Sequence, residues 1–198
     1  MAVLHPITAQ SFAIIDAEIG PHGFDSKEYR VVQRVIHSTA DFEFKHLLRF
    51  EHGAMASGLA ALGDNIPVIV DVQMVKVAVA GLLASLGCPL LCALDEPVEV
   101  APGQTRTETG LLALIRRYPE AIYVIGNAPT ALLALVDAAS RGEASPALIV
   151  GVPVGFVQVV QAKQALSQTK IPQIRTEGRK GGSPVAAAIV NALVTLVA

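Results

Sequence analysis

The sequence predicts an α/β fold, with a mostly parallel sheet flanked by helices and a helical N-terminal region. Three observations favour it. Apolar residues make up 52% of the 198 residues, yet aromatic residues make up 5% and tryptophan is absent, a composition typical of buried parallel strands covered by small-residue helices. Short β-branched runs alternate with helix-like segments through the middle and end of the chain. Residues 1–60, in contrast, show helical periodicity.

Two helices are predicted in the N-terminal region. The segment TAQSFAIIDAEIG (residues 8–20) places its large apolar residues on one face, as an amphipathic helix does. The segment DSKEYRVVQRVIHSTAD (residues 25–41) opens with Asp25 three residues before Glu28, which is the spacing of a capping box. We therefore expect the second helix to begin next to Asp25.

His37 lies near the end of this second helix. The apolar residues of the helix gather on one side: Val31, Val32, Val35 and Ile36. His37 falls on the other side, in line with Arg34 and Asp41. This face is either simply solvated or the wall of a site, in which Arg34 holds an anion and Asp41 favours the protonated imidazole. In the second case His37 is suited to donate and recover a proton.

Five apolar runs are predicted to be strands, because each is followed by a turn and a helix-like segment. They lie near residues 66–70, 90–94, 121–125, 147–150 and 172–176. Pro129 and Pro184 stand near helix starts, where a missing N–H costs little. Asp71 and Ser183 are candidate N-caps, and Gly142 suits the end of the helix that starts near Pro129.

Nothing in the sequence divides the chain, so we expect one domain over residues 1–198. The net charge of −2 gives no general attraction to nucleic acid or anionic membranes. The apolar stretch 77–94 is interrupted by Gly87 and Pro89, which favours a buried helix followed by a buried strand over a membrane span. Cys88 and Cys92 within it are expected to be buried thiols. We find no secretory signal and expect a cytoplasmic protein.

Three glycine-rich loops follow predicted strands. They read GNAPT (126–130), GVPVG (151–155) and GRKGGS (178–183). Ligands of α/β sheets bind at this edge, and free N–H groups at helix starts favour anions. Ordinary turns with solvated basic residues are the alternative interpretation for each loop.

Other kinds of site have less support. Two glycine motifs bind phosphate, G-x-x-x-x-G-K-[ST] and a G-x-G-x-x-G that follows a strand, and the chain contains neither. A nucleotide-dependent enzyme is therefore only a weak alternative. His46 and His52 lie near glutamates but form no i, i+4 pair, and we expect no metal site. Arg106 starts an amphipathic segment and is either a solvated first-turn residue or another anion contact.

Taken together, six segments closely resemble the precorrin-8X methylmutase family of cobalamin biosynthesis. They are SFAIIDAEI, RVIHSTADFEF, VIVDVQMV, VIGNAPTAL, GVPVGFV and GRKGGSPVAAAIVNAL. The resemblance runs from about residue 6 to the C-terminus and keeps the order of every motif. The combination of IGNAPTAL and GRKGGS in a chain of this length is highly specific.

The resemblance implies an enzyme, an isomerase that moves a methyl group from C11 to C12 of a corrin precursor by a 1,5-sigmatropic shift, without a cofactor. It also implies a homodimeric α/β protein that binds the macrocycle near the subunit interface. The catalytic histidine of the family matches His37, as proton donor and acceptor. Ser11 and Arg34 match substrate contacts. Six further residues are candidate substrate contacts: Thr39, Arg106, Gly126, Asn127, Lys180 and Ser183.

Some residues depart from the family pattern. Ser38 stands where threonine is frequent, which keeps a hydroxyl, and Gln161 and Gln164 stand where acidic residues are common. The sequence TAD after His37 resembles the cobalt-dependent branch, so we expect conversion of cobalt-precorrin-8 to cobyrinic acid rather than of precorrin-8X to hydrogenobyrinic acid. The cobalt would belong to the substrate. A corrinoid carrier without turnover is the alternative from another functional class.

Overall fold

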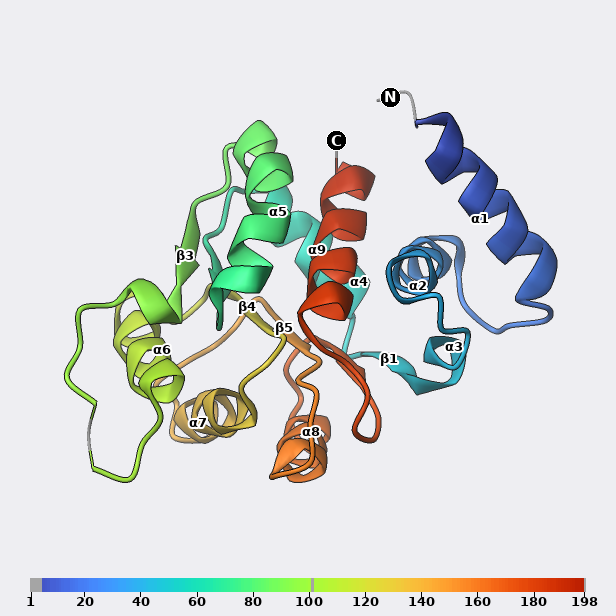
Figure 1. Ribbon diagram of the computed structural model, residues 1–198. Helices are drawn as coiled ribbons and strands as arrows, with labels where there is room; N and C mark the ends of the chain where they lie inside the picture. Colours follow the sequence, from blue (N-terminus) through green and yellow to red (C-terminus); the bar gives the residue numbers. More distant parts are fainter. Residues whose placement is uncertain (1–4, 101, 198) are drawn as a thin grey trace.

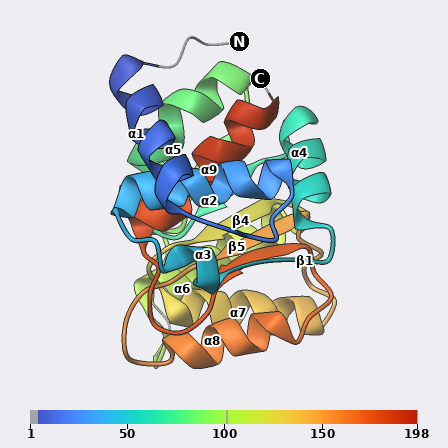
Figure 2. The same ribbon diagram turned by 90° about the vertical axis from the view of Figure 1, so that its right-hand side faces the viewer.

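The computed structural model describes residues 5–100 and 102–197 as three layers, with a six-stranded sheet between two sets of helices (Figures 1 and 2). The strands are β1 (Leu48–Glu51), β2 (Val68–Val70), β3 (Leu90–Cys92), β4 (Ile122–Ile125), β5 (Leu148–Gly151) and β6 (Gln173–Thr176). The helices are α1 (Pro6–Glu18), α2 (Ser26–Thr39), α3 (Phe44–Leu47), α4 (Ala54–Gly63), α5 (Gln73–Leu86), α6 (Arg106–Arg117), α7 (Pro129–Ser140), α8 (Val159–Ser167) and α9 (Ser183–Val197). A 3₁₀ turn, η1 (Ala93–Asp95), follows β3.

The sheet has the strand order β1-β6-β5-β4-β2-β3, and β2 to β6 are parallel. The five predicted strands and the mostly parallel sheet are therefore confirmed. From β2 the chain moves outward through α5 to β3, then returns past β2 to β4 and continues to β5 and β6. Because α5 and α7 lie on opposite faces (Figure 1), the carboxyl ends of β2 and β4 flank a topological switch point, where α/β sheets usually bind ligands.

The expectation that the first 60 residues are only helical was wrong. β1 is a four-residue edge strand that pairs antiparallel with β6, with Leu48 opposite Thr176. Its sequence, LRFE, is too short to show a period, and its partner lies more than 120 residues away. A strand of this kind is defined by long-range pairing and not by local pattern.

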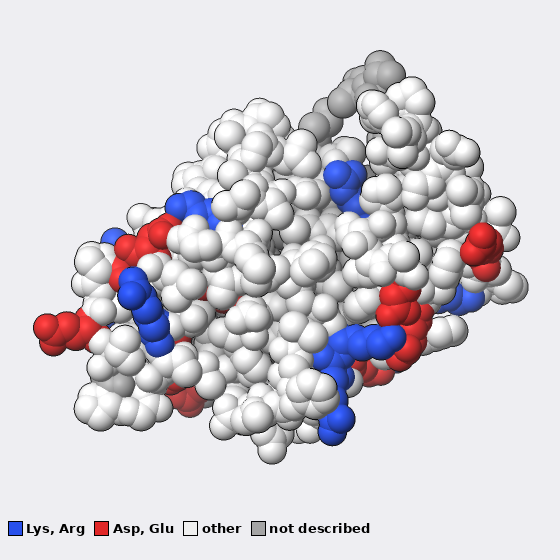
Figure 3. Space-filling view, viewed as in Figure 1, with Lys and Arg blue, Asp and Glu red and all other residues white. Residues whose placement is uncertain are grey.

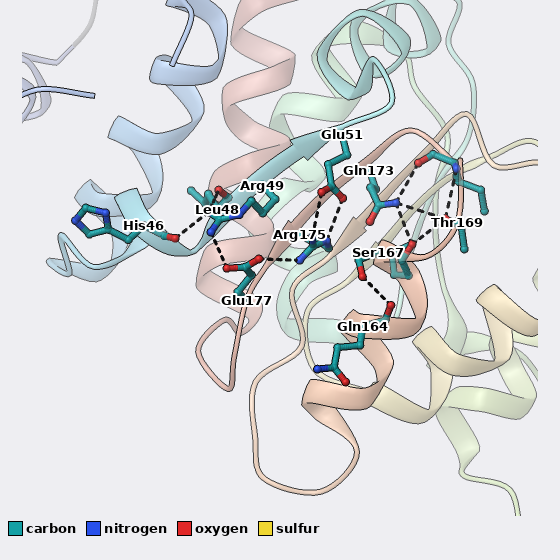
Figure 4. A network of polar contacts seen from close by, with 12 residues as sticks. His46, Leu48, Arg49, Glu51, Gln164, Ser167, Thr169, Gln173, Arg175 and Glu177 are labelled. Carbon is teal, nitrogen blue, oxygen red and sulfur yellow. Dashed lines mark hydrogen bonds and ion pairs between the residues drawn. The ribbon is translucent and has the colours of Figure 1, made fainter. Parts of the chain in front are cut away.

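An ion-pair network fixes this edge strand (Figure 4). The guanidinium of Arg175 donates to both carboxylate oxygens of Glu51, at 3.1 and 3.2 Å. Arg49 forms an ion pair with Glu177 at 2.6 Å, and Arg175 lies 3.7 Å from the other oxygen of Glu177. Alternating cations and carboxylates thus join β1 to the end of β6, just before the GRKGGS loop.

Residues of the parallel strands alternate between two hydrophobic cores, as the two faces of a strand require. Val68 and Val70 pack with helices α2, α4, α5 and α9, whereas Ile69 packs with α6, α7 and α8. All three side chains are fully buried. Burial on both faces explains why these strands read as continuous β-branched runs.

Several predicted helix ends are confirmed. The Asp25 carboxylate accepts from the Glu28 N–H at 2.8 Å, and the Glu28 carboxylate accepts from the Asp25 N–H at 3.2 Å, which completes the capping box. Pro129 opens α7, and Gly142 follows its end with φ of +74°. The N-cap predictions for Asp71 and Ser183 were wrong, because Val72 precedes α5 and Ser183 is itself the first residue of α9.

The apolar stretch 77–94 forms the end of α5 and then β3, as predicted, but α5 is buried on one side only. Val75, Val79 and Leu83 face the core, while Met74 and Val77 are 64% and 77% exposed. In the described part of the chain no helix has the length and hydrophobicity to cross a membrane. Both cysteines are buried free thiols, as expected, and burial raises their pKa.

Candidate functional site

The contact between α1 and α2 places a hydroxyl against the imidazole of His37. Ser11 on α1 and His37 on α2 are 26 residues apart, and the Ser11 Oγ lies 2.7 Å from the His37 Nδ1. The ring of Phe12 meets the imidazole edge-on, with 5.3 Å between ring centroids. Two neighbouring residues of α1 therefore orient one side chain of α2. The other ring nitrogen, Nε2, makes no hydrogen bond with any residue in the described ranges.

A cavity of about 340 Å³ adjoins this contact. It is an open pocket lined by α1, the end of α2 and the residues just after α2, and its wall is largely apolar. The lining residues are Ile7, Gln10, Ser11, Ile14, Ile15, Ile36, His37, Ala40 and Phe42. The cavity therefore combines the predicted catalytic histidine with an apolar surface, as small-molecule sites commonly do.

The predicted orientation of α2 is confirmed. Its four apolar residues are at most 1% exposed, whereas His37 is exposed. Arg34, one turn earlier, is half-buried, and this burial lowers the pKa of its guanidinium. Within residues 5–100 and 102–197, the guanidinium of Arg34 forms neither a hydrogen bond nor an ion pair. A half-buried cation without a partner suits an anionic ligand group.

Lys180 joins the GRKGGS loop to the end of α2. Its ammonium lies 2.7 Å from carboxylate oxygens of both Asp41 and Glu43. The Lys180 partner lowers the pKa of Asp41, and the two carboxylates raise the pKa of Lys180. Asp41 is thus engaged by Lys180 and by the Glu43 N–H at 2.9 Å. The structure shows no hydrogen bond between Asp41 and His37, a contact that the sequence left open.

Asp71 is a site residue that the sequence argument missed, because its position suggested a helix cap. It is fully buried, and its carboxylate accepts from the N–H groups of Gly126, Asn127 and Ala128 at 3.0, 2.7 and 2.8 Å. Burial raises the pKa of Asp71, and the three donors oppose this effect. One carboxylate from the end of β2 thereby fixes the loop after β4, across the switch point.

Gly126 and Ser183 face each other at the same place. A Cβ on Gly126 would come within 3.2 Å of the Ser183 Cα and within 3.0 Å of Val75 and Ala186 side-chain atoms, so a side chain at this position would be tightly packed. The Ser183 hydroxyl is buried and has no hydrogen-bond partner in the described part of the chain. Asn127 is exposed. These three predicted site residues therefore lie together at the carboxyl edge of the sheet.

Lys163 on α8 is a second residue that the sequence argument did not assign to the site. It is 2% exposed, and its Nζ donates to the carbonyl oxygens of Gly178 and Lys180 at 3.0 and 2.7 Å. Burial, with a smaller contribution from Arg175, lowers its pKa to about 7. The sequence signal was a lysine at an apolar position of an amphipathic helix.

Two predicted substrate contacts, Thr39 and Arg106, lie apart from the loops at the carboxyl edge of the sheet. The Thr39 hydroxyl donates to the Val35 carbonyl at 2.8 Å and accepts from the Asp41 N–H at 3.3 Å, so it serves the end of α2. Arg106 begins α6 and donates to the Leu94 carbonyl at 3.3 Å. Figure 1 places α6 at the opposite side of the sheet from α1 and α2. Thr39 and Arg106 remain predictions.

Figure 3 shows that the charged side chains on this face of the molecule lie in separate groups, with a broad uncharged area between them. Among the described residues, no group of three or more histidine, cysteine, aspartate or glutamate side chains is placed to hold a metal ion. In the described ranges the structure offers an exposed histidine oriented by a hydroxyl, an apolar pocket wall, an Arg34 guanidinium without a hydrogen-bond partner, and glycine-rich loops.

Comparison with known proteins assigns this arrangement to a family. The sequence profile of precorrin-8X methylmutase matches residues 6–196. The chain is 53% identical to a cobalt-precorrin-8 methylmutase of Synechocystis sp., over 97% of this chain and 95% of that protein. It is 36% identical to a precorrin-8X methylmutase of Pseudomonas aeruginosa, over 96% and 94% of the two chains.

A solved structure agrees with these sequence relatives. The precorrin-8X methylmutase of Thermus thermophilus superposes with a TM-score of 0.90 at 43% identity, and the match covers 98% of each chain. The shared architecture confirms the α/β fold predicted from the sequence. The chain therefore belongs to the precorrin-8X methylmutase family, and it is a methylmutase, an isomerase of cobalamin biosynthesis.

Proposed function

We propose that the protein moves a methyl group from C11 to C12 of cobalt-precorrin-8, with His37 as the proton donor and acceptor. The observation that carries this proposal is the 2.7 Å contact between the Ser11 Oγ and the His37 Nδ1 beside an apolar cavity. An imidazole held through one nitrogen leaves the other nitrogen to exchange a proton with a bound ring.

The Ser11 contact supports a simple proton cycle. A hydroxyl can accept as well as donate, and we take the Ser11 Oγ to accept from the Nδ1–H in both protonation states of the imidazole. The exchanged proton then sits on Nε2. His37 donates it to the conjugated macrocycle as the methyl group migrates and recovers a proton afterwards, so that substrate and product are isomers. Catalysis of this kind contributes about 10²–10⁴-fold to the rate, and oriented binding supplies the remainder.

The substrate carries several carboxylate side chains, and we take two basic groups outside the cavity lining, one on α2 and one on the GRKGGS loop, as candidates to receive them. Arg34 lacks a protein partner in the described ranges and is our first candidate for a carboxylate contact. Lys180 is the second, since its two carboxylate partners are exposed enough for a substrate carboxylate to compete. The buried Ser183 hydroxyl and the start of α9 offer further donors at the carboxyl edge.

The cobalt-containing substrate is supported by the relatives. Proteins 53% and 40% identical to this chain, from Synechocystis sp. and Leptospira interrogans, are cobalt-precorrin-8 methylmutases. The Pseudomonas aeruginosa precorrin-8X methylmutase is 36% identical. Greater similarity to the first group agrees with the TAD sequence after His37. The cytoplasmic location stays a prediction.

Turnover of cobalt-precorrin-8 and of metal-free precorrin-8X by the wild type and by His37→Ala tests the proposal. The wild type should convert the cobalt form faster, and the variant should lose about 10²–10⁴-fold in kcat while still binding the corrin product. His46→Ala is the matched control, because His46 is also an exposed histidine, on α3. Normal turnover by His37→Ala would remove His37 from the mechanism, and preference for precorrin-8X would reverse the assignment of substrate.

We further propose a homodimer in which a second copy completes the site. A cavity of about 340 Å³ lies at the small end of ligand pockets, and a corrin with its side chains exceeds a typical ligand. Ile7 and Ile14 on α1, and Met74 and Val77 on α5, are between 51% and 77% exposed. Large apolar residues exposed on two surface helices are candidates for an interface of this kind.

Analytical ultracentrifugation tests the dimer. The wild type should sediment as a dimer, and the double substitution Met74→Lys with Val77→Lys should shift it to monomer and reduce turnover. Val100→Lys is the control, since Val100 is 48% exposed and lies outside both helices. A monomeric wild type with full turnover contradicts the proposal.

A further inference from the structure

Lys163 occupies an unusual position for a lysine. It projects from α8 into the protein, and it is the only lysine within the described residues that is buried. Burying an amine is costly unless hydrogen bonds compensate. The Lys163 amine donates to two backbone carbonyls of a single loop, those of Gly178 and Lys180. It donates to no carboxylate in the described ranges. A packing role alone would be served by a methionine or leucine at this position.

The loop that Lys163 holds is the one that carries Lys180. The Lys180 carbonyl also accepts from the Thr176 hydroxyl at 2.9 Å, so two donors fix the peptide on which the Lys180 side chain stands. The side chain of the same residue extends to the segment after α2, where the Lys180 ammonium donates to the carboxylates of Asp41 and Glu43. Lys163 is thus connected through one residue to the segment that follows His37.

The same loop is fastened to the GVPVG loop. The Gly182 N–H donates to the Val152 carbonyl at 2.8 Å, and the Gly155 N–H donates to the Arg179 carbonyl at 3.2 Å. A Cβ on Gly181 would come within 2.2 Å of the Val152 oxygen, so the two loops pack without room for a side chain. These contacts set the path of the backbone, whereas Lys163 and Thr176 act on the Lys180 peptide itself.

The charges around Lys163 favour this use of its donors. The charged group that acts on it is Arg175, the paired arginine of β6, whose cation lowers the pKa of the Lys163 amine. Arg175 in turn is paired with Glu51 and lies near Glu177 (Figure 4). A neutral amine still donates two N–H groups, so Lys163 can hold both carbonyls in either protonation state.

We propose that Lys163 is a positioning residue for the corrin substrate, which fixes the backbone of residues 178–180 so that the Lys180 ammonium stands beside the end of α2. This inference rests on the proposed function, because it takes Lys180 to contact a substrate carboxylate. Lys163 itself does not touch the substrate. Its removal leaves the Lys180 side chain present but free to take other positions, which weakens binding and not the proton transfer at His37.

A double-mutant cycle on the full-length protein tests this inference. The dissociation constant of cobyrinic acid is measured by visible-spectrum titration for the wild type, Lys163→Met, Lys180→Ala and the double variant. Methionine keeps the length of the side chain and removes the donors. We expect each single variant to weaken binding by about tenfold and the double variant to bind no more weakly than Lys180→Ala, because residues that act through one another are not additive.

Three further measurements separate positioning from a merely structural role. Lys163→Met should raise KM while kcat stays within about twofold of the wild type, since the interaction lost is one of uniform binding. Thr176→Val, which removes the other donor to the Lys180 carbonyl, should weaken binding in the same direction and keeps the test valid if Lys163→Met does not fold. Lys170→Met, at an exposed lysine, should leave binding unchanged.

The outcomes are distinct. The inference about Lys163 is overturned if the two single effects multiply in the double variant. It is also overturned if both Lys163→Met and Thr176→Val bind as the wild type does. A wild type that binds cobyrinic acid without turning over either substrate overturns the proposed function, while the binding cycle still decides the role of Lys163.

Discussion

The α1–α2 pair and the loops at the carboxyl edge of the sheet both contribute to the site, but they are held in different ways. In the first region, Ser11 and Phe12 contact an exposed His37 across two helices, and Figure 2 shows α1 as the outermost element. In the second, a buried carboxylate, Asp71, and a buried amine, Lys163, bind loop backbone directly.

The two buried groups form a complementary set. Asp71 accepts from three N–H groups of the GNAPT loop, and Lys163 donates to two carbonyls of the GRKGGS loop. Buried charge-assisted hydrogen bonds are strong and leave few alternative arrangements. The exposed contact between Ser11 and His37 contributes little to folding but sets the direction of one ring. The loops at the carboxyl edge are therefore fixed by buried groups, whereas His37, the proposed proton donor, is oriented by contacts at the surface.

Breaking the Asp71 contacts should give the largest loss of stability. Asp71→Asn keeps the size of the side chain, but it removes the charge and turns an NH₂ group towards backbone donors. We expect the free energy of unfolding to fall by about 3 kcal/mol, as for a buried charged hydrogen-bonding group left unsatisfied, measured by urea denaturation. Asp64→Asn, at an exposed aspartate, should change it by less than about 0.5 kcal/mol. Equal effects would show that Asp71 does not hold the loop.

The pH dependence of stability should reveal Lys163. Its pKa is about 7 in the folded protein and about 10.4 when unfolded. Between these values the unfolded state binds more protons, so the free energy of unfolding rises with pH, by at most about 1.4 kcal/mol per pH unit from this group. Below pH 7 both states are protonated, and the full cost of burying the charge is present.

Chemical denaturation of the wild type and of Lys163→Met at intervals from pH 6 to 10 measures this contribution. The wild type should gain stability relative to the variant as pH rises above 7. Lys170→Met should follow the wild type, because Lys170 is exposed. A constant difference between the wild type and Lys163→Met would mean that Lys163 keeps an ordinary pKa in its buried position.

Ser11→Ala should have the smallest effect on stability and so sharpens the contrast between the regions. The free energy of unfolding should change by less than about 0.5 kcal/mol, as at most surface positions. Turnover should fall by about tenfold, since the imidazole of His37 loses the hydroxyl that orients it. Ser26→Ala, at an exposed serine that opens α2, should leave turnover unchanged. Unaltered turnover by Ser11→Ala would separate Ser11 from the action of His37.

Much of the fold was determined by patterns that are local in the chain. The β-branched runs predicted the parallel strands, and the spacing of Asp25 and Glu28 predicted the start of α2. The periodicity of the valines in α2 indicated that His37 faces away from the core. The motif resemblance gave the family, which the relatives confirmed. Each of these signals lies within a segment shorter than about 20 residues.

What remained was decided by contacts between distant segments. β1 exists because β6 pairs with it, Asp71 and Lys163 serve loops whose positions only folding brings near them, and Asp41 is engaged by Lys180. A residue type and a local spacing cannot specify a partner 15 to 139 positions away. The sequence by itself therefore determined the five parallel strands, the start of α2, the family and the catalytic candidate. Only the tertiary structure decided which buried charges hold the binding loops, because a hydrogen bond between remote groups depends on the packing of the whole chain.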